Sequence, residues 1–229
     1  MRPPGADTVV MQEQVERDGD MVRIGSGHKH GQNVRAAGED LAIGQQVFTA
    51  GKRLTSADIG VLASLGLADV SVYRRLKVAF FSTGDELRRP GESLDDGGVY
   101  DSNRLTLMGM LTRIGAEVID KGIIRDQRDE VEKALATAAA EADVIITSGG
   151  VSTGDADYVE QVLRDKGELG FWRVSIKPGR PLAFGKIENA VFFGLPGNPV
   201  AVMVTFYQFL SYALGAMMGE TEPHGAPIL

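Results

Sequence analysis

The stretch at residues 143–158 constrains the fold most, because its pattern is that of a strand, a glycine-rich turn and the start of a helix. The β-branched run at 144–146 is typical of a buried parallel strand. Thr153 or Asp155 is placed to cap the helix that follows. Backbone N–H groups and a helix N-terminus meet an anion in this geometry, so the stretch predicts a ligand site. The turn contains Gly149, Gly150, Ser152, Thr153 and Gly154.

Spacing excludes two common nucleotide-binding loops at this turn. A P-loop would need Lys and Ser or Thr after Gly154, where Asp155 and Ala156 stand. The glycines at 149–154 do not fit the Gly-x-Gly-x-x-Gly dinucleotide fingerprint either. Asp155 and Asp157 are unfavourable beside bare phosphate unless a metal ion or basic side chains offset them. An ordinary strand-to-helix turn remains the structural alternative.

Composition limits the classes of function. The chain has 229 residues, a net charge of −7, no cysteine and three histidines. This charge argues against nonspecific nucleic-acid binding, and the missing thiols exclude disulfides and thiolate chemistry. We find no apolar run of membrane-spanning length and no signal-peptide pattern, so we expect a cytoplasmic protein without a membrane partner.

The chain changes character along its length. Residues 7–52 are expected to be β-rich, with strands at 8–13, 21–24 and 46–49 and a hairpin turn at Asp18-Gly19. A helix at 57–64, capped by Ser56, and a strand at 69–73 are expected next. The corresponding domain division is a partial β-rich domain (1–54), a helix and connector (55–75), an α/β domain (76–219) and a linker (220–229).

Strands and helices alternate from Lys77 onward, which predicts a three-layer α/β/α sandwich with a mostly parallel sheet. One helix is expected to end at Gly115, and another to begin near Pro199 and run to about Met217. The expected strands are 78–81, 117–119, 122–124, 144–146, 171–177, 181–187 and 190–194, and the other helices are 127–141 and one after the glycine turn.

Charged and polar residues follow these strands at their carboxyl ends, where the ligand crevice of an open α/β sheet lies. Such a mixture of acids and cations predicts a phosphorylated ligand bound with a divalent cation, or a hard oxyanion held by the same cations. The residues are Thr83, Gly84, Asp85, Glu86, Asp126, Asp155, Asp157, Arg173, Lys177, Arg180, Gly197 and Asn198.

Several of these residues have a structural alternative. Asp126 would also suit a helix cap, Glu86 a solvated loop, and Lys177 with Arg180 a basic turn around Pro-Gly. Their convergence favours a site over each separate alternative. The sequence shows no Ser-His-Asp or Cys-His set, so covalent nucleophilic catalysis has little support.

Six sequence motifs occur in order along the chain. They are Ser82-Thr-Gly-Asp-Glu-Leu87, Tyr100-Asp-Ser-Asn103, Gly122-Ile-Ile-Arg-Asp126, the glycine stretch at 147–158, Ile176-Lys-Pro-Gly-Arg-Pro181 and Gly194-Leu-Pro-Gly-Asn-Pro199. Together they resemble the molybdopterin molybdenumtransferase family (MoeA and the gephyrin E-domain), and the upstream segment at 33–40 also resembles the β-rich second domain of that family. The resemblance covers essentially the whole chain, although the family's N-terminal region and C-terminal β-barrel domain are expected to have no counterpart in it.

The resemblance implies insertion of molybdate into adenylylated molybdopterin, with release of AMP assisted by Mg²⁺. By motif, Glu86, Asp126 and Asp157 match acidic positions that would act in catalysis and hold the metal, and Lys177 matches a catalytic cation. Arg173 stands where the family commonly has lysine. The implied ligand-binding residues are Thr83, Gly84, Asp85, Ser148, Gly149, Gly150, Ser152, Gly154, Arg173, Arg180, Pro196, Gly197 and Asn198.

The resemblance also implies a homodimer and an adenylyltransferase as a partner. Two other functions remain open. One is molybdopterin adenylylation, as in the related MogA and MoaB proteins, which share the sheet domain but lack a segment like 7–52. The other is a pterin-binding or scaffold module without catalytic activity.

Overall fold

The computed structural model describes residues 3–150 and 158–221. Two compact units are present, an N-terminal unit (Met1–Thr49) and a sheet unit (Ala50–Leu229). Each unit is described by itself. The fourfold domain division stays a prediction.

The N-terminal unit contains one hairpin rather than the expected set of strands. Its strands β1 (Val15–Asp18) and β2 (Met21–Ile24) pair antiparallel around the predicted turn, with Gly19 at φ 57°. The strands expected at 8–13 and 46–49 are wrong, because the described chain there is irregular apart from the 3₁₀ turn η1 (Gln12–Gln14). None of the described residues of this unit is buried, and strand propensity alone does not form a sheet without a surface to pack on.

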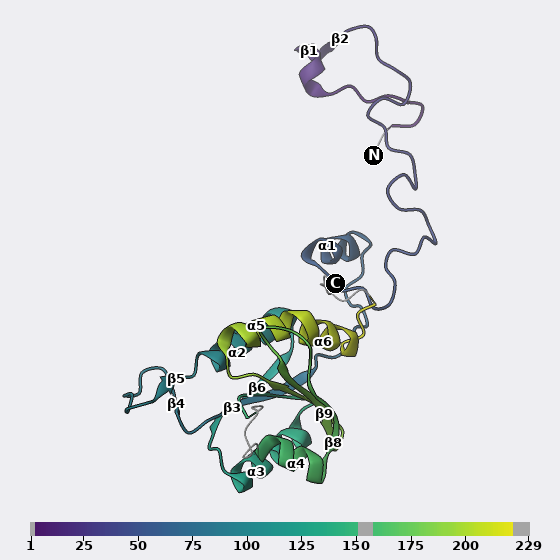
Figure 1. The fold of residues 1–229 in the computed structure, drawn as a ribbon. Coiled ribbons are helices and arrows are strands. Elements are labelled where there is room, and N and C mark those ends of the chain that lie inside the picture. The colour runs from purple at the N-terminus through teal and green to yellow at the C-terminus, as the bar shows by residue number, and fades with distance from the viewer. Residues whose placement is uncertain (1–2, 151–157, 222–229) are drawn as a thin grey trace. The chain divides into compact units, whose positions relative to one another are not determined.

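The sheet unit is built on six strands, and the predicted mostly parallel α/β fold is confirmed (Figure 1). Four neighbouring strands are parallel, and the last two continue the sheet with antiparallel pairing. In spatial order the strands are β6 (Glu117–Ile124), β3 (Lys77–Thr83), β7 (Val144–Ser148), β10 (Ala190–Leu195), β9 (Pro181–Ile187) and β8 (Glu168–Arg173).

Helices cover both faces of this sheet (Figure 1). On β3, Val78 and Phe80 pack toward one face, and Ala79 and Phe81 pack toward the other. This alternation explains why a strand buried on both sides has a continuous apolar sequence. One face carries α2 (Ser102–Ile114), α5 (Pro199–Thr205), the π-helical segment η2 (Phe206–Leu210) and α6 (Ser211–Met217), and the other carries α3 (Arg128–Glu141) and α4 (Tyr158–Lys166).

Some boundaries differ from the sequence-based expectations for local reasons. Helix α1 (Ser56–Ser64) is capped by Thr55 rather than Ser56, because Thr55 and Asp58 form a reciprocal capping box. The strands expected at 117–119 and 122–124 are one strand, β6, whose register shifts around Gly122 at φ 81°. Helix α2 ends, as expected, at a left-handed Gly115.

Two other expected strands need correction. Residues 69–73 form no strand. Strand β8 covers 168–173 rather than 171–177, since the chain leaves the sheet after Arg173 to turn back into β9 at Pro181. The short parallel pair β4 (Leu87–Arg88) and β5 (Val99–Tyr100) was not expected.

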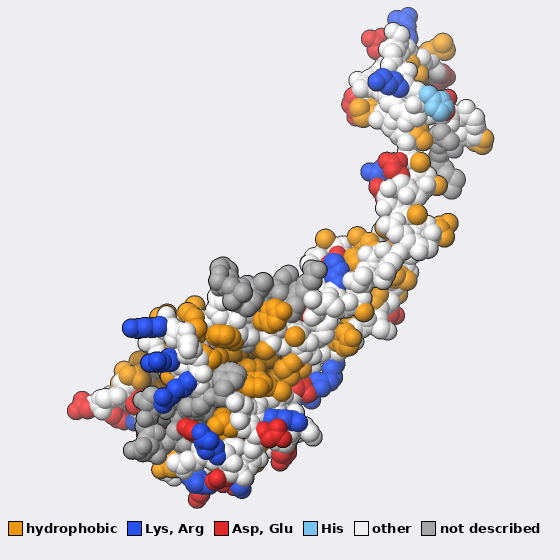
Figure 2. Space-filling view, turned by 45° about the vertical axis from the view of Figure 1, so that its right-hand side comes forward, with side chains coloured by type: hydrophobic (Ala, Val, Ile, Leu, Met, Phe, Trp, Pro, Cys, Tyr) orange, Lys and Arg blue, Asp and Glu red, His pale blue; other side chains and the backbone are white. Residues whose placement is uncertain are grey.

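The continuous helical run Pro199–Met217 corrects the expectation that no apolar run reaches membrane-spanning length. By length and composition its 19 residues would suffice. Val202, Phe206 and Leu210 of this run are fully buried in the core on the sheet, so it packs as a core helix. Its outer side contributes apolar residues to the surface, and Figure 2 shows hydrophobic side chains gathered on one face of the sheet unit.

Candidate functional site

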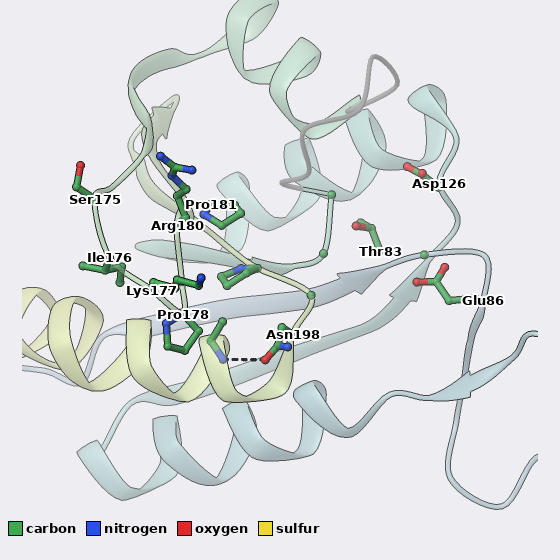
Figure 3. Close-up of a pocket in the computed structure, with 17 residues that line it drawn as sticks. Thr83, Glu86, Asp126, Ser175, Ile176, Lys177, Pro178, Arg180, Pro181 and Asn198 are labelled. Atoms are coloured by element: carbon green, nitrogen blue, oxygen red, sulfur yellow. Dashed lines mark hydrogen bonds between the residues drawn. The ribbon is translucent and has the colours of Figure 1, made fainter.

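A cavity of about 1000 Å³ lies at the carboxyl edge of the sheet, where the parallel strands end (Figure 3). This is the position expected for a ligand in an open α/β sheet. The loops after β3, β6, β7 and β10 line it, together with the connection from β8 to β9. Its lining residues are Thr83, Gly84, Glu86, Asp126, Gly149, Gly150, Ser175, Ile176, Lys177, Pro178, Gly179, Arg180, Pro181, Pro196, Gly197, Asn198 and Ala201.

Most of the residues singled out from the sequence meet at this cavity. Asp85 and Ser148 do not line it but contact its surroundings: Asp85 accepts a hydrogen bond from the Asp126 backbone, and Ser148 accepts one from Asn103. Arg173 is exposed at the end of β8 and does not line the cavity. Ser152, Gly154, Asp155 and Asp157 lie outside the described residues, as do both predicted caps of α4.

Gly149 and Gly150 lie against Thr83 at a distance that excludes a side chain. A Cβ on Gly149 would lie 2.5 Å from the Thr83 carbonyl oxygen, and one on Gly150 would lie 2.7 Å from its hydroxyl. Both glycines also have positive φ, at 85° and 66°. The end of β7 therefore lies against the end of β3 beside the cavity, and no side chain separates the two backbones there.

Acidic residues form one side of the cavity (Figure 3). Although the Asp126 side chain is exposed overall, partial burial of its carboxyl raises its pKa, and the nearby charges of Asp85 and Glu86 raise it further. Asp126 is not the cap of α3, whose N-cap is Gln127, so the capping alternative is not supported. The ion pairs within the described part of the chain include neither Glu86 nor Asp126. Negative charge is therefore held together without a counter-ion from those residues.

The acidic side fits a cation in part. The charges of Asp85 and Glu86 raise the pKa of Asp126, and such neighbouring carboxylates are ligands that Mg²⁺ accepts. Within residues 3–150 and 158–221, however, no group of three Asp, Glu or His side chains is arranged to hold a metal. Asp157, the third predicted metal ligand, lies outside those residues, so the metal assignment stays a prediction.

Basic residues form the opposite side. Figure 3 shows Lys177 and Arg180 across the cavity from Glu86 and Asp126. Their loop is closed by a hydrogen bond of 3.0 Å from the Val174 amide to the Arg180 carbonyl. Gly179 is buried in this loop, where a Cβ would lie 2.8 Å from the Thr205 methyl group. Packing against the helix α5 thus holds the two cations toward the cavity.

The loop after β10 forms the floor between these sides. The Asn198 side-chain oxygen accepts hydrogen bonds from the backbone of Val200 and Ala201, which caps α5. Pro199 is the first residue of the helix, as the sequence predicted. A Cβ on Gly197 would meet nothing within 4 Å, so this residue leaves room on the cavity side of the cap.

Sequence reasoning missed several residues of the site. Most of the additional lining residues (Ile176, Pro178, Gly179 and Pro181) lie inside motifs that the resemblance had already marked. Ser175 lies directly before one such motif, and Ala201 lies two residues after another. Asn103 is different, because it belongs to a motif without an assigned role and reaches the site from α2.

At the ends of β3 and β7, the hydroxyls of Ser82, Thr83 and Thr147 are buried and have no hydrogen-bond partner among residues 3–150 and 158–221. The same holds for the side-chain oxygen of Asn103 in the first turn of α2. Such atoms are rare in protein interiors and usually mark water or a ligand. They adjoin the cavity that Thr83 lines.

Comparison with known proteins points to one family. A family model described as "Probable molybdopterin binding domain" matches residues 79–216, and one described as "MoeA N-terminal region (domain I and II)" matches residues 1–66. A molybdopterin molybdenumtransferase of Haemophilus influenzae is 46% identical over 233 residues, covering 100% of this chain and 58% of that protein. A gephyrin of Dictyostelium discoideum is 37% identical, covering 95% of this chain and 34% of that protein.

A solved structure agrees with these relatives. The molybdopterin biosynthesis MoeA protein of Pyrococcus horikosii matches with a TM-score of 0.76 and 32% identity, over 97% of this chain and 56% of that one. The chain spans little more than half the length of the molybdenumtransferase relatives, with 58% and 52% of two of them covered.

Proposed function

Because the chain belongs to the family of the probable molybdopterin binding domain, we propose that its cavity binds molybdopterin for the insertion of molybdenum. The observation that carries this proposal is the cavity at the carboxyl edge, which has bare glycine backbone on its floor, Lys177 and Arg180 on one side and Glu86 and Asp126 on the other. The names of the molybdenumtransferase relatives agree with it.

Each side of the cavity has a distinct task in this proposal. Lys177 and Arg180 pair with the phosphate of the pterin, since cationic donors form strong hydrogen bonds with phosphate oxygens. Backbone amides of the glycine turns donate to the same anion. The substrate is molybdopterin carrying an AMP group, and molybdate is the second substrate.

The release of AMP requires that negative charge on the leaving phosphate be stabilised. Lys177 and Arg180 supply part of this stabilisation from fixed positions. Glu86 and Asp126 would hold Mg²⁺, together with Asp157, which lies outside the described residues. A bound Mg²⁺ would supply Lewis-acid polarisation of the phosphate oxygens.

An AMP-release assay tests this function. Purified chain is incubated with adenylylated molybdopterin, with and without molybdate, beside the full-length Haemophilus influenzae relative as a positive control. Molybdate-dependent AMP release is expected, and Glu86→Ala should lower it at least tenfold by removing an acidic group of the cavity. Asp129→Ala changes an exposed acid in the first turn of α3 and should leave the rate unchanged.

Other outcomes of this assay would assign another function. Formation of adenylylated molybdopterin from ATP would identify an adenylyltransferase. Tight molybdopterin binding without turnover would identify a pterin-binding module. Equal AMP release by wild type and Glu86→Ala would contradict the assignment of Glu86.

The proposed reaction also defines its context. Its substrate must come from an adenylyltransferase, and we expect the chain to act beside one in the cytoplasm as a homodimer. Light scattering of the purified chain measures the oligomeric state directly, and a monomer at micromolar concentration would contradict the dimer.

A further inference from the structure

Asn103 connects two loops of the cavity without lining the cavity itself. It lies in the first turn of α2 with 9% of its surface exposed. Its side-chain nitrogen donates two hydrogen bonds, one of 3.0 Å to the Ser148 hydroxyl and one of 2.7 Å to the Gly197 carbonyl. Both hydrogens of the amide group are therefore used, one for each loop.

These two bonds begin where the backbone pairing of the sheet stops. The register between β7 and β10 ends at the pair Ser148 and Leu195. The Gly149 amide then donates to the Leu195 carbonyl at 3.1 Å. Beyond this point the register between the two strands ends, and Gly149 and Gly150 after β7 and Gly197 and Asn198 after β10 line the cavity. Asn103 joins these two segments beyond the end of the strand pairing.

The turn that carries Asn103 is itself fixed. Asp101 caps α2 by accepting a hydrogen bond from the Arg104 amide at 3.1 Å. The Asp101 amide donates to the Arg88 carbonyl, and the Arg104 guanidinium pairs with Asp120 on β6. A helix turn that is held by its own cap and by contacts to Arg88 and Asp120 provides a rigid support for the Asn103 amide group.

We propose that Asn103 is a positioning residue that sets the spacing of the two loops, and hence the affinity of the cavity for molybdopterin. The inference rests on the proposed function. Asn103 is suited to this task because the two acceptors, a hydroxyl and a carbonyl, face a group that supplies two donors. Loss of the donors leaves the partly buried Gly197 carbonyl and the buried Ser148 hydroxyl without this partner.

The isosteric variant Asn103→Asp removes the two hydrogen-bond donors of the amide group while it keeps the packing of the side chain. It retains the shape of the side chain but presents an oxygen to the Gly197 carbonyl. Asn103→Ala removes both donation and volume. The matched control is Ser102→Ala, one residue away in the same helix turn, where the side chain is exposed.

Three measurements are made on all four proteins. Amide hydrogen exchange is recorded for residues 148–150 and 196–201, with the amides of α3 as the internal reference. Molybdopterin binding is measured by titration, and kcat and KM by AMP release. For both Asn103 variants we expect about tenfold faster exchange in the two loops, about tenfold weaker binding, and a larger change in KM than in kcat. Ser102→Ala should match wild type.

The outcomes separate this inference from the proposed function. If wild type fails to bind molybdopterin, the proposed function fails while the exchange data still decide the role of Asn103. Wild-type exchange in both loops of Asn103→Asp overturns the inference, and so does faster exchange spread evenly over α3 and the loops. If Asn103→Ala does not fold, Asn103→Asp decides alone.

Discussion

The two edges of the sheet differ in how their acidic side chains are surrounded. An acid at the amino edge is paired with a cation, and an acid at the carboxyl edge lies near other acids. At the amino edge, Arg74 makes two bonds of 2.6 and 2.7 Å to Asp143, whose carboxylate also accepts the Lys77 amide at 2.9 Å. The hydrogen bonds from Arg74 lower the pKa of Asp143, with a smaller contribution from the Lys77 amide. At the carboxyl edge, partial burial and the charges of Asp85 and Glu86 raise the pKa of Asp126.

The charges of the amino edge contribute to stability, whereas those of the carboxyl edge belong to the candidate site. At the amino edge, Arg74 and Asp143 join the start of β3 to the start of β7. These paired charges stabilise the folded state. The carboxyl edge retains repelling acids, glycines at positive φ and buried hydroxyls that have no hydrogen-bond partner within the described part of the chain. Such features cost stability, and they persist where a ligand or a reaction requires them.

The largest expected effect comes from a side chain at the strained turn of the carboxyl edge. Gly149→Ala should lower the free energy of unfolding by about 2–3 kcal/mol, because its Cβ would meet the Thr83 carbonyl and its φ is positive. Urea denaturation measures the change. Gly197→Ala is the control, since a Cβ there meets nothing within 4 Å, and it should cost well under half as much. Equal losses would show that the two turns are equally tolerant.

Removal of the paired acid tests the amino edge. Asp143→Ala should lower the free energy of unfolding by about 1–2 kcal/mol at pH 7, because the Lys77 amide and Arg74 lose a charged partner. Because the folded pKa of Asp143 is lowered, its contribution is present above the unfolded pKa of about 4 and is lost as the pH falls through the folded value. Urea denaturation at pH 7 and pH 3 should show the difference between variant and wild type shrinking.

A control for that variant is Glu117→Ala. Lys77 and Glu117 are 3.8 Å apart with both side chains about half exposed, at 49% and 55%. Their pair should contribute less than about 0.5 kcal/mol. A loss as large as that of Asp143→Ala would mean that general charge balance, rather than the specific bonds of Asp143 to Arg74 and Lys77, stabilises this edge.

Addition of Mg²⁺ tests whether the acids of the carboxyl edge bind a cation. At a free concentration ten times its Kd, Mg²⁺ should stabilise the wild type by about 1.4 kcal/mol. The rise in Tm is measured against NaCl of equal ionic strength, and Glu86→Gln should show a smaller rise. No shift in the wild type at millimolar Mg²⁺, or the same shift in the variant, would sink the metal assignment.

The smallest expected effect has the opposite sign to that of Asp143. Asp126→Asn should raise the free energy of unfolding at pH 7 by a few tenths of a kcal/mol, since an exposed carboxyl is well screened. A raised folded pKa favours the fold below the unfolded value of about 4, and this contribution is lost as the pH rises through the folded value. The gain should therefore vanish near pH 3. A loss of stability at pH 7 would mean that Asp126 is paired after all.

The sequence predicted the sheet unit better than the N-terminal unit. Strand β9 was predicted with its observed ends, and the end of α2 at Gly115 followed from glycine's tolerance of positive φ. In the N-terminal unit, residues 8–13 have strand-like composition, but none of them is buried and they form no strand. Residue patterns predict structure well where the apolar side chains become buried in the core, and poorly where the side chains remain exposed.

Site residues divide in a similar way. Glu86, Lys177 and Asn198 were predicted because each follows a strand within a recognisable motif, and all three line the cavity. Arg173 was assigned from the resemblance, inside the expected strand at 171–177, and does not line the cavity, because it is the last residue of β8 and only the connection after it reaches the cavity. Asn103 was missed because its partners lie 45 and 94 residues further along the chain.

By itself the sequence determined the alternation of strands and helices, the glycine turns and the order of motifs that places the chain in its family. These features depend on near neighbours and on apolar period, which the sequence states directly. Only the tertiary structure decided that acids and cations face each other across one cavity and that Asn103 joins two loops. Strand order, register and burial set those distances, because they arise from contacts between segments far apart in the chain.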